Sequence, residues 1–230
     1  MEVLIILGMH RSGTSALARC LQEMGVSFII PSIHDGYWDK HIEYYQINQL
    51  NDEILKSWKA PILDRHFLFT KFMEYKVRKF VDTNIPKDKL VGIKDPRMLL
   101  TFDYWAPNIT KFKIIGIFRR PEEIASSLAI RDVYGKASFD QGLELWKTYN
   151  EGLLSIHNKH KFPILNFNES KENFGKHLES ICCELDLPFS QEIFDSIFTE
   201  TKKHHNSENI PEKYLSIYNS LLNISNSVHP

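Results

Sequence analysis

The sequence has few of the residues, and none of the long apolar runs, that mark secreted, metal-binding or membrane-spanning proteins. Its 230 residues include three cysteines, Cys20, Cys182 and Cys183, which are too few for a disulfide framework and lack zinc-ligand spacing. Its ten histidines show no metal-ligand spacing either, so we expect no bound metal. No stretch approaches the roughly 20 apolar residues of a membrane span, and the apolar run at residues 3–7 is too short for a signal peptide. We therefore expect a cytoplasmic protein with no integral membrane segment.

The chain also lacks an excess of charge of either sign. A formal net charge of -1 gives no general attraction to nucleic acid or to an anionic membrane, so we expect no nucleic-acid partner. With 43% hydrophobic and 25% charged residues, the composition is typical of a globular protein. The length suits one domain over residues 1–230, and nothing in the pattern specifies an oligomeric state.

Short β-rich apolar runs alternate with segments of helical periodicity. Strands are predicted over residues 3–7, 26–30, 89–94, 112–118 and 163–167, and helices over residues 13–24, 40–56, 64–82, 122–131, 138–157, 171–184, 191–198 and from Pro211 onward. The helical segments at about 40–85 and 190–225 should flank the sheet, and the polar stretch 199–209 should be a loop. This alternation predicts an α/β three-layer sandwich with a central parallel sheet.

The segment that follows the first predicted strand has the spacing of a phosphate-binding loop. It reads Gly8-Met9-His10-Arg11-Ser12-Gly13-Thr14-Ser15. Its two glycines allow backbone N–H groups to approach a phosphate, and the next helix directs its positive end at the same anion. A nucleoside-triphosphate loop ends in Gly-Lys-Ser/Thr, whereas here Thr14 follows Gly13 and the nearby cation is Arg11. The loop is therefore predicted to hold a phosphate-like group without the usual ATP–Mg²⁺ apparatus.

Basic side chains follow the ends of several predicted strands. Ligands of such sheets bind beyond the carboxyl ends of the strands, which brings together residues 8–15, 94–97, 119–127 and those after 167. Three of these four segments carry Arg or Lys. Their convergence predicts one anion-binding site at this edge of the sheet.

On these residues the sequence resembles the sulfotransferases that use 3′-phosphoadenosine 5′-phosphosulfate (PAPS), in particular their bacterial branch. The first loop looks like the family's 5′-phosphosulfate loop. The segment from Phe118 to Ser127 looks like its 3′-phosphate segment, with Arg119 and Ser127 in the binding positions. The stretches 36–39, 94–97 and 145–149 also resemble blocks of the bacterial branch. The likeness extends over residues 3–170, while the C-terminal third matches weakly.

The resemblance implies a P-loop NTPase-like sulfotransferase topology and transfer of a sulfuryl group from PAPS, without metal, to a hydroxyl or amine. The acceptor would be a carbohydrate, a glycolipid or a small metabolite. The donor would be bound by His10, Arg11, Ser12, Gly13, Thr14, Ser15, Arg119 and Ser127. Arg11 would stabilise the charge that develops on the leaving group. Lys94 would contact the sulfuryl oxygens, or alternatively extend its charged head into water.

The catalytic base is open among five residues. They are Glu43, Asp39, Asp95, His34 and His10. Glu43 and Asp39 are favoured, with Glu43 expected in the helix 40–56, and Asp95 is expected to orient Lys94 or Arg97. Two other functions are kept open: a P-loop-like nucleotide or small-molecule kinase, and a catalytically inactive nucleotide-binding scaffold.

Overall fold

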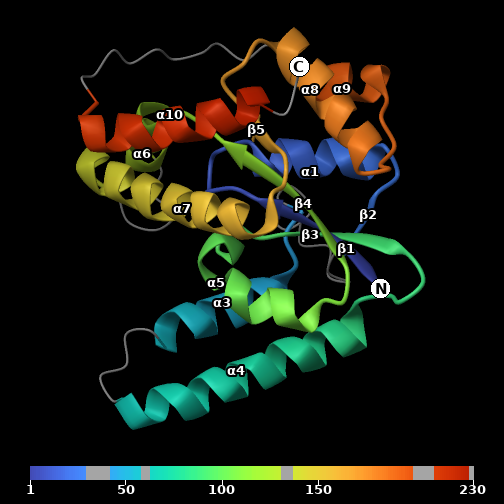
Figure 1. Ribbon diagram of the computed structural model, residues 1–230, viewed down its shortest axis with the longest axis vertical. Helices are drawn as coiled ribbons and strands as arrows, with labels where there is room; N and C mark the ends of the chain where they lie inside the picture. Colours follow the sequence, from blue (N-terminus) through green and yellow to red (C-terminus); the bar gives the residue numbers. More distant parts are fainter. Residues whose placement is uncertain (30–41, 58–62, 131–136, 199–209, 228–230) are drawn as a thin grey trace.

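The central sheet contains five parallel strands, β1 (Glu2–Leu7), β2 (Ser27–Phe28), β3 (Leu90–Lys94), β4 (Phe112–Phe118) and β5 (Ile164–Asn166). The structure is a computed structural model that describes residues 1–29, 42–57, 63–130, 137–198 and 210–227. The strand order is β2-β3-β1-β4-β5 (Figure 1), and every neighbouring pair is parallel. Parallel neighbours require crossover connections, and these contain the helices.

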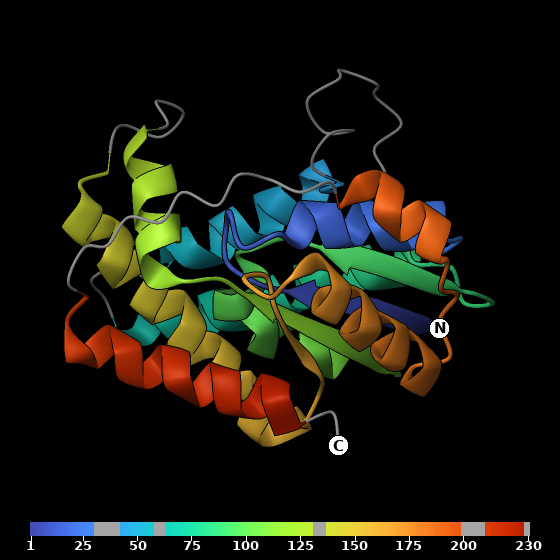
Figure 2. The same cartoon turned by 90° about the horizontal axis from the view of Figure 1, so that it is seen from above.

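Helices cover both faces of the sheet. Their bounds are α1 Thr14–Glu23, α3 Tyr45–Ser57, α4 Leu63–Asn84, α5 Met98–Trp105, α6 Pro121–Ile130, α7 Phe139–His160, α8 Lys171–Glu184, α9 Gln191–Ile197 and α10 Glu212–Ser227, with a short 3-10 turn, η1, at Ala106–Asn108. One core cluster joins the sheet to α1, α8 and α9, and the other joins it to α3, α4, α5, α7 and α10 (Figure 1, Figure 2). The predicted three-layer α/β fold is therefore confirmed.

The central strand, β1, is buried on both faces, which explains why its sequence is a continuous apolar run. Val3, Ile5 and Leu7 of β1 pack into the cluster with α3, α5 and α7, whereas Leu4 and Ile6 pack into the cluster with α1 and α8. A strand buried on both faces needs apolar residues at every position. No helix in the described segments has the length and apolar character needed to cross a bilayer.

The structure differs from the predicted elements in three places. Strand β2 contains only Ser27–Phe28, which is shorter than the predicted 26–30. Helix α3 begins at Tyr45, so the placement of Glu43 within a helix was wrong: Glu43 lies just before it. Helix α5 was not predicted. The stretch 199–209, expected to be a loop, lies outside the described residues.

Helix α5 escaped prediction because its residues show no amphipathic period. Met98, Leu99, Thr101, Phe102 and Trp105 are all buried within its eight residues. A short helix enclosed by other elements has no polar stripe from which a 3.6-residue period can be recognised.

A buried asparagine joins α3 to the end of β3 and to α5. The Asn51 side chain is fully buried; its Nδ2 donates to Asp95 Oδ2 at 3.1 Å. Its Oδ1 accepts hydrogen bonds from Thr101 Oγ1 at 2.7 Å and from Trp105 Nε1 at 2.8 Å. Three buried polar groups on other elements therefore depend on one amide, and buried groups left without partners are costly.

We predict that Asn51→Ala lowers the free energy of unfolding by about 2–4 kcal/mol, because it removes a hydrogen bond from each of the buried Trp105, Thr101 and Asp95 side chains. Urea denaturation measures the change. The matched control is Gln46→Ala, an exposed residue of the same helix, which should alter stability by no more than about 0.5 kcal/mol. Equal stability of the two variants would contradict a structural role for the Asn51 network.

Candidate functional site

The loop of residues 8–15 connects β1 to α1 in a tight, glycine-dependent conformation. Arg11 has a φ of 70° and Gly13 a φ of 97°. A Cβ on Gly13 would lie 2.4 Å from the Phe167 ring, and one on Gly8 would lie 2.6 Å from the carbonyl oxygen of Ile117. Backbone conformation and lack of space together therefore require glycine at Gly13, and lack of space requires it at Gly8.

The first turn of α1 follows this loop and carries features of an anion site. Its N-cap is Gly13; no side chain of the described residues caps it, and no acidic residue lies in the turn. Its N–H groups and positive dipole end therefore suit an anion. The Ser12 hydroxyl donates to the Met9 carbonyl at 2.7 Å, within the loop itself. Its expected contact with a phosphate stays a prediction.

Lys94, the last residue of β3, lies against the same loop. Its side chain is 1% exposed, and its Nζ lies 2.6 Å from Glu43 Oε1 and 3.0 Å from Ser15 Oγ. The alternative in which the Lys94 head extends into water is therefore wrong. Glu43 also accepts a hydrogen bond from Asn48 Nδ2 at 3.0 Å. The structure thus brings together three predicted site residues, one from the loop, one from the sheet and one from the segment before α3.

The electrostatics of this pair keep Glu43 ionised at neutral pH. Burial raises the pKa of Glu43, but the Lys94 ammonium and the hydrogen bonds from Lys94 and Asn48 outweigh it, so the pKa lies below its usual value. Burial lowers the pKa of Lys94 and exceeds the opposing effect of Glu43. Contact with Lys94 makes Glu43 a weak base, and Glu43 accepts a proton more readily when that ammonium turns toward a bound anion.

His10 is held as a neutral imidazole inside the loop. Burial, followed by the charges of Arg97, Lys94 and Arg11 and opposed by Glu43, lowers the pKa of His10 to about 4. Its ring meets Tyr149 edge-on, with centroids 6.0 Å apart. A neutral imidazole can accept a proton or a hydrogen bond, so His10 stays a base candidate beside Glu43.

The other base candidates are placed differently. Asp95 is fully buried; it accepts a hydrogen bond from the Arg97 backbone N–H at 2.8 Å and from Arg97 Nη1 at 3.2 Å. Arg97 Nε also contacts Asp52 Oδ1 at 2.8 Å. Asp95 therefore orients Arg97, one of the two partners expected of it. Asp39 and His34 lie outside the described residues.

The second predicted anion group adjoins the loop. Arg119 follows β4, and its Nη1 donates to the Arg11 carbonyl at 3.4 Å, while its guanidinium carbon lies 5.5 Å from the centre of the Phe167 ring. Ser127 on α6 accepts a hydrogen bond from Arg11 Nε at 2.9 Å. Helix α6 therefore folds back across the strand end, as contact between Ser127 and this site requires. The family resemblance implies that Arg11 and Ser127 bind opposite ends of the donor, whereas in the structure their side chains are hydrogen-bonded to each other.

Glu123 contacts Arg119, and Asn168 contacts Glu123. Neither residue is predicted as a site residue from the sequence. Glu123 Oε2 accepts from Arg119 Nε at 2.5 Å, and Glu123 Oε1 accepts from Asn168 Nδ2 at 2.9 Å. A Glu four residues after an Arg, at the start of a helix, was a usable signal for the first contact. Asn168 carried no such signal, because it comes from another strand end.

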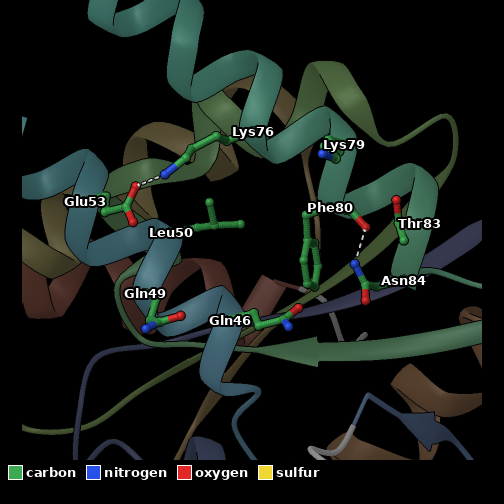
Figure 3. A pocket seen from close by; sticks show the side chains of 9 residues that line it. All are labelled: Gln46, Gln49, Leu50, Glu53, Lys76, Lys79, Phe80, Thr83 and Asn84. Atoms are coloured by element: carbon green, nitrogen blue, oxygen red, sulfur yellow. Dashed lines mark hydrogen bonds and ion pairs between the residues drawn. The ribbon is translucent and has the colours of Figure 1, made fainter.

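A separate hollow of about 360 Å³ lies between α3 and α4 (Figure 3), and its lining includes Leu50 and Phe80. The Lys76–Glu53 ion pair, 2.5 Å long, crosses its rim. None of its lining residues belongs to the loop or to the Lys94–Glu43 pair. Across the described residues, no group of three or more His, Cys, Asp and Glu side chains could hold a metal ion.

We predict that His10 makes the protein less stable as the pH falls from 7 to 5. An imidazole whose pKa is about 4 in the folded protein and about 6.5 in the unfolded chain takes up its proton first in the unfolded chain, which costs roughly 2 kcal/mol of folding free energy over this interval. Urea denaturation of the wild type and of His10→Gln, which does not titrate there, measures the difference. Parallel stability curves for the two proteins would show that His10 is not held neutral.

No family model and no curated protein sequence matches the chain. Solved structures do match it, and two of them are sulfotransferases with a TM-score above 0.5. The sulfotransferase domain of the Synechococcus PCC 7002 olefin synthase is 14% identical, with 96% of this chain and 94% of that one covered and a TM-score of 0.60. A sulfotransferase from Mycobacterium tuberculosis is 15% identical, with 85% and 70% covered and a TM-score of 0.51. At these identities the similarity establishes the fold, which is the P-loop-like α/β fold of these sulfotransferases.

Proposed function

We propose that this protein is a sulfotransferase that moves a sulfuryl group from PAPS to a hydroxyl or amine acceptor. The observation that carries the proposal is the contact of the Lys94 ammonium with Ser15 Oγ, 3.0 Å away, at the end of the phosphate-type loop. The fold similarity to two sulfotransferases supports it.

The position of Lys94 argues against a Mg²⁺-nucleotide site. In a nucleoside-triphosphate loop, Lys follows the second glycine and the next Ser or Thr binds Mg²⁺. Thr14 and Ser15 occupy those two positions here. The cation comes instead from β3 and already contacts the hydroxyl that would bind the metal, and an ammonium at that point repels a divalent ion. The loop therefore suits an anion that a lysine neutralises.

The basic side chains and the helix-start amides around the loop support binding of the two charged ends of PAPS. The donor would supply a sulfuryl group bonded to a phosphate oxygen. The amides at the start of α1 and the guanidinium of Arg11 would bind that phosphosulfate, and Arg119 would bind the 3′-phosphate. Ser127 contacts Arg11 at 2.9 Å. The side chains that would bind the phosphosulfate and the 3′-phosphate are therefore in contact with one another. Guanidinium groups suit phosphates because they offer paired donors.

Glu43 and Lys94 would divide the acceptor chemistry between them. Glu43 would take the proton from the acceptor hydroxyl or amine as its oxygen or nitrogen bonds to sulfur. The bond between sulfur and the bridging oxygen breaks, and the electron pair leaves with adenosine 3′,5′-bisphosphate. Lys94 and Arg11 would stabilise the negative charge that grows on that oxygen. An acceptor of the carbohydrate, glycolipid or small-metabolite class stays part of the proposal.

We predict that adenosine 3′,5′-bisphosphate binds without metal and more tightly than adenosine 5′-phosphate, and that Arg119→Ala lowers the first affinity about 10–100-fold because it removes a charged hydrogen-bond donor. Calorimetry with the wild type and the variant measures both affinities. An equal loss of affinity for the two nucleotides would show that Arg119 does not bind the 3′-phosphate. Preference for ATP with Mg²⁺ would favour a kinase, and binding of no nucleotide a scaffold.

We predict that Glu43→Gln lowers kcat about 10²–10⁴-fold without weakening bisphosphate binding, because the amide can still contact Lys94 but accepts no proton. Transfer of labelled sulfuryl from PAPS to a panel of sugars and phenols measures the rate. The matched control is Glu53→Gln. Glu53 pairs with Lys76 at 2.5 Å, in the hollow between α3 and α4. Wild-type turnover in Glu43→Gln would exclude it as the base, and Asp39→Asn and His10→Gln are the next variants.

A further inference from the structure

Two acidic residues are buried in the first turn of α6, directly after the two arginines. Glu122 is 4% exposed and Glu123 is 8% exposed. Glu122 pairs with Arg120, whose side chain is 44% exposed, and Glu123 pairs with Arg119, whose side chain is 25% exposed. Two residues of equal charge and similar burial therefore have different arginine partners, of which only Arg119 contacts the loop.

The Glu123 carboxylate receives two donors from different parts of the chain. Its Oε2 accepts from Arg119 Nε at 2.5 Å, and its Oε1 accepts from Asn168 Nδ2 at 2.9 Å. Asn168 is fixed in turn, because its Oδ1 accepts the Arg120 backbone N–H at 2.7 Å and its own N–H donates to Asn166 Oδ1 at 3.0 Å. Exchanging the amide oxygen and nitrogen of Asn168 would lose both the bond from Arg120 N–H and the bond to Glu123.

The same contacts fix which edge of Arg119 is left for an anion. A guanidinium has five N–H donors in a planar fork. The Nε–H of Arg119 is used by Glu123, and one Nη1 proton points at the Arg11 carbonyl, 3.4 Å away in the loop. Phe167 lies against one face, and Trp146 Nε1 donates to the Arg119 carbonyl at 2.9 Å. The Nη1–Nη2 edge therefore lies at the loop.

We propose that Glu123 and Asn168 are positioning residues that hold the Arg119 guanidinium so that its Nη1–Nη2 edge binds the 3′-phosphate of the nucleotide. This inference rests on the proposed function. In this proposal, Glu123 increases the preference for a nucleotide with a 3′-phosphate over one without it. Its carboxylate does so through Arg119 and does not itself contact the nucleotide. The carboxylate must accept on both oxygens, which an amide cannot do.

Charge alone predicts the opposite effect of removing Glu123. Deleting a negative charge beside the proposed 3′-phosphate site strengthens binding of the bisphosphate at least as much as binding of the monophosphate, so the affinity ratio stays the same or rises. A positioning role predicts weaker binding of the 3′-phosphate only, since the Arg119 edge is no longer held. The sign of the change in the affinity ratio between the two nucleotides therefore separates the two roles.

The test is calorimetry of adenosine 3′,5′-bisphosphate and adenosine 5′-phosphate with the wild type, Glu123→Gln, Asn168→Ser and the matched control Glu122→Gln. We expect Glu123→Gln to lower the affinity ratio of the bisphosphate to the monophosphate about tenfold, and Asn168→Ser about threefold. Glu122→Gln should leave that ratio unchanged. In an Arg119→Ala background, Glu123→Gln should have no further effect on the ratio.

An unchanged or increased ratio in Glu123→Gln, with the wild type preferring the bisphosphate, overturns this inference alone. A wild type that binds both nucleotides equally overturns the proposed function and the inference with it. Where Glu123→Gln fails to fold, Asn168→Ser decides by the same ratio, because it removes the second donor to the carboxylate while the Arg119–Glu123 pair stays in place. If Glu122→Gln lowers the affinity ratio as much as Glu123→Gln does, the effect comes from loss of negative charge at the start of α6. The inference about Glu123 is then overturned.

Discussion

The site depends on one buried ammonium. Moving the Lys94 charge out of water costs several kcal/mol, and Glu43 and Ser15 offset that cost from two other parts of the chain. The parallel register of β1 and β3, which pairs Ile6 with Lys94, places the ammonium beside the end of β1, where the loop begins. A shift of one residue would turn the Lys94 side chain to the other face of the sheet. The loop, the Lys–Glu pair and the start of α3 therefore form only when the sheet has its native register.

The sequence predicted the strands and the loop well because both are local patterns. Strands that are buried on two faces are apolar at every position. Glycine is required at Gly8 and Gly13 because neither position has space for a Cβ. Helix α5 and the start of α3 were not predictable in this way. Asn51 and Trp105 interact through one buried amide, and such pairing depends on tertiary packing that no periodicity reports.

The same distinction applies to the site residues. Motif spacing identified Arg11, Arg119 and Ser127 as residue types suited to phosphates, but it could not give the direction in which α6 crosses the loop. That direction is set by packing of Ile124 and Ala125 into the core on the α7 side, and it brings Ser127 to Arg11. The Lys94–Glu43 contact was likewise hidden, because residues 51 apart in the chain meet only after the sheet and α3 have assembled.

Carboxylates orient the cations around the loop and largely neutralise them. Lys94 contacts Glu43, Arg97 contacts Asp95 and Asp52, and Arg119 contacts Glu123. These pairs fix the directions of three of the cations, so part of the affinity for an anion comes from geometry. Donors that are already oriented need not reorganise when a charge develops beside them. The acidic residues thus limit where the cations of the site can point, at the expense of long-range attraction for an anion.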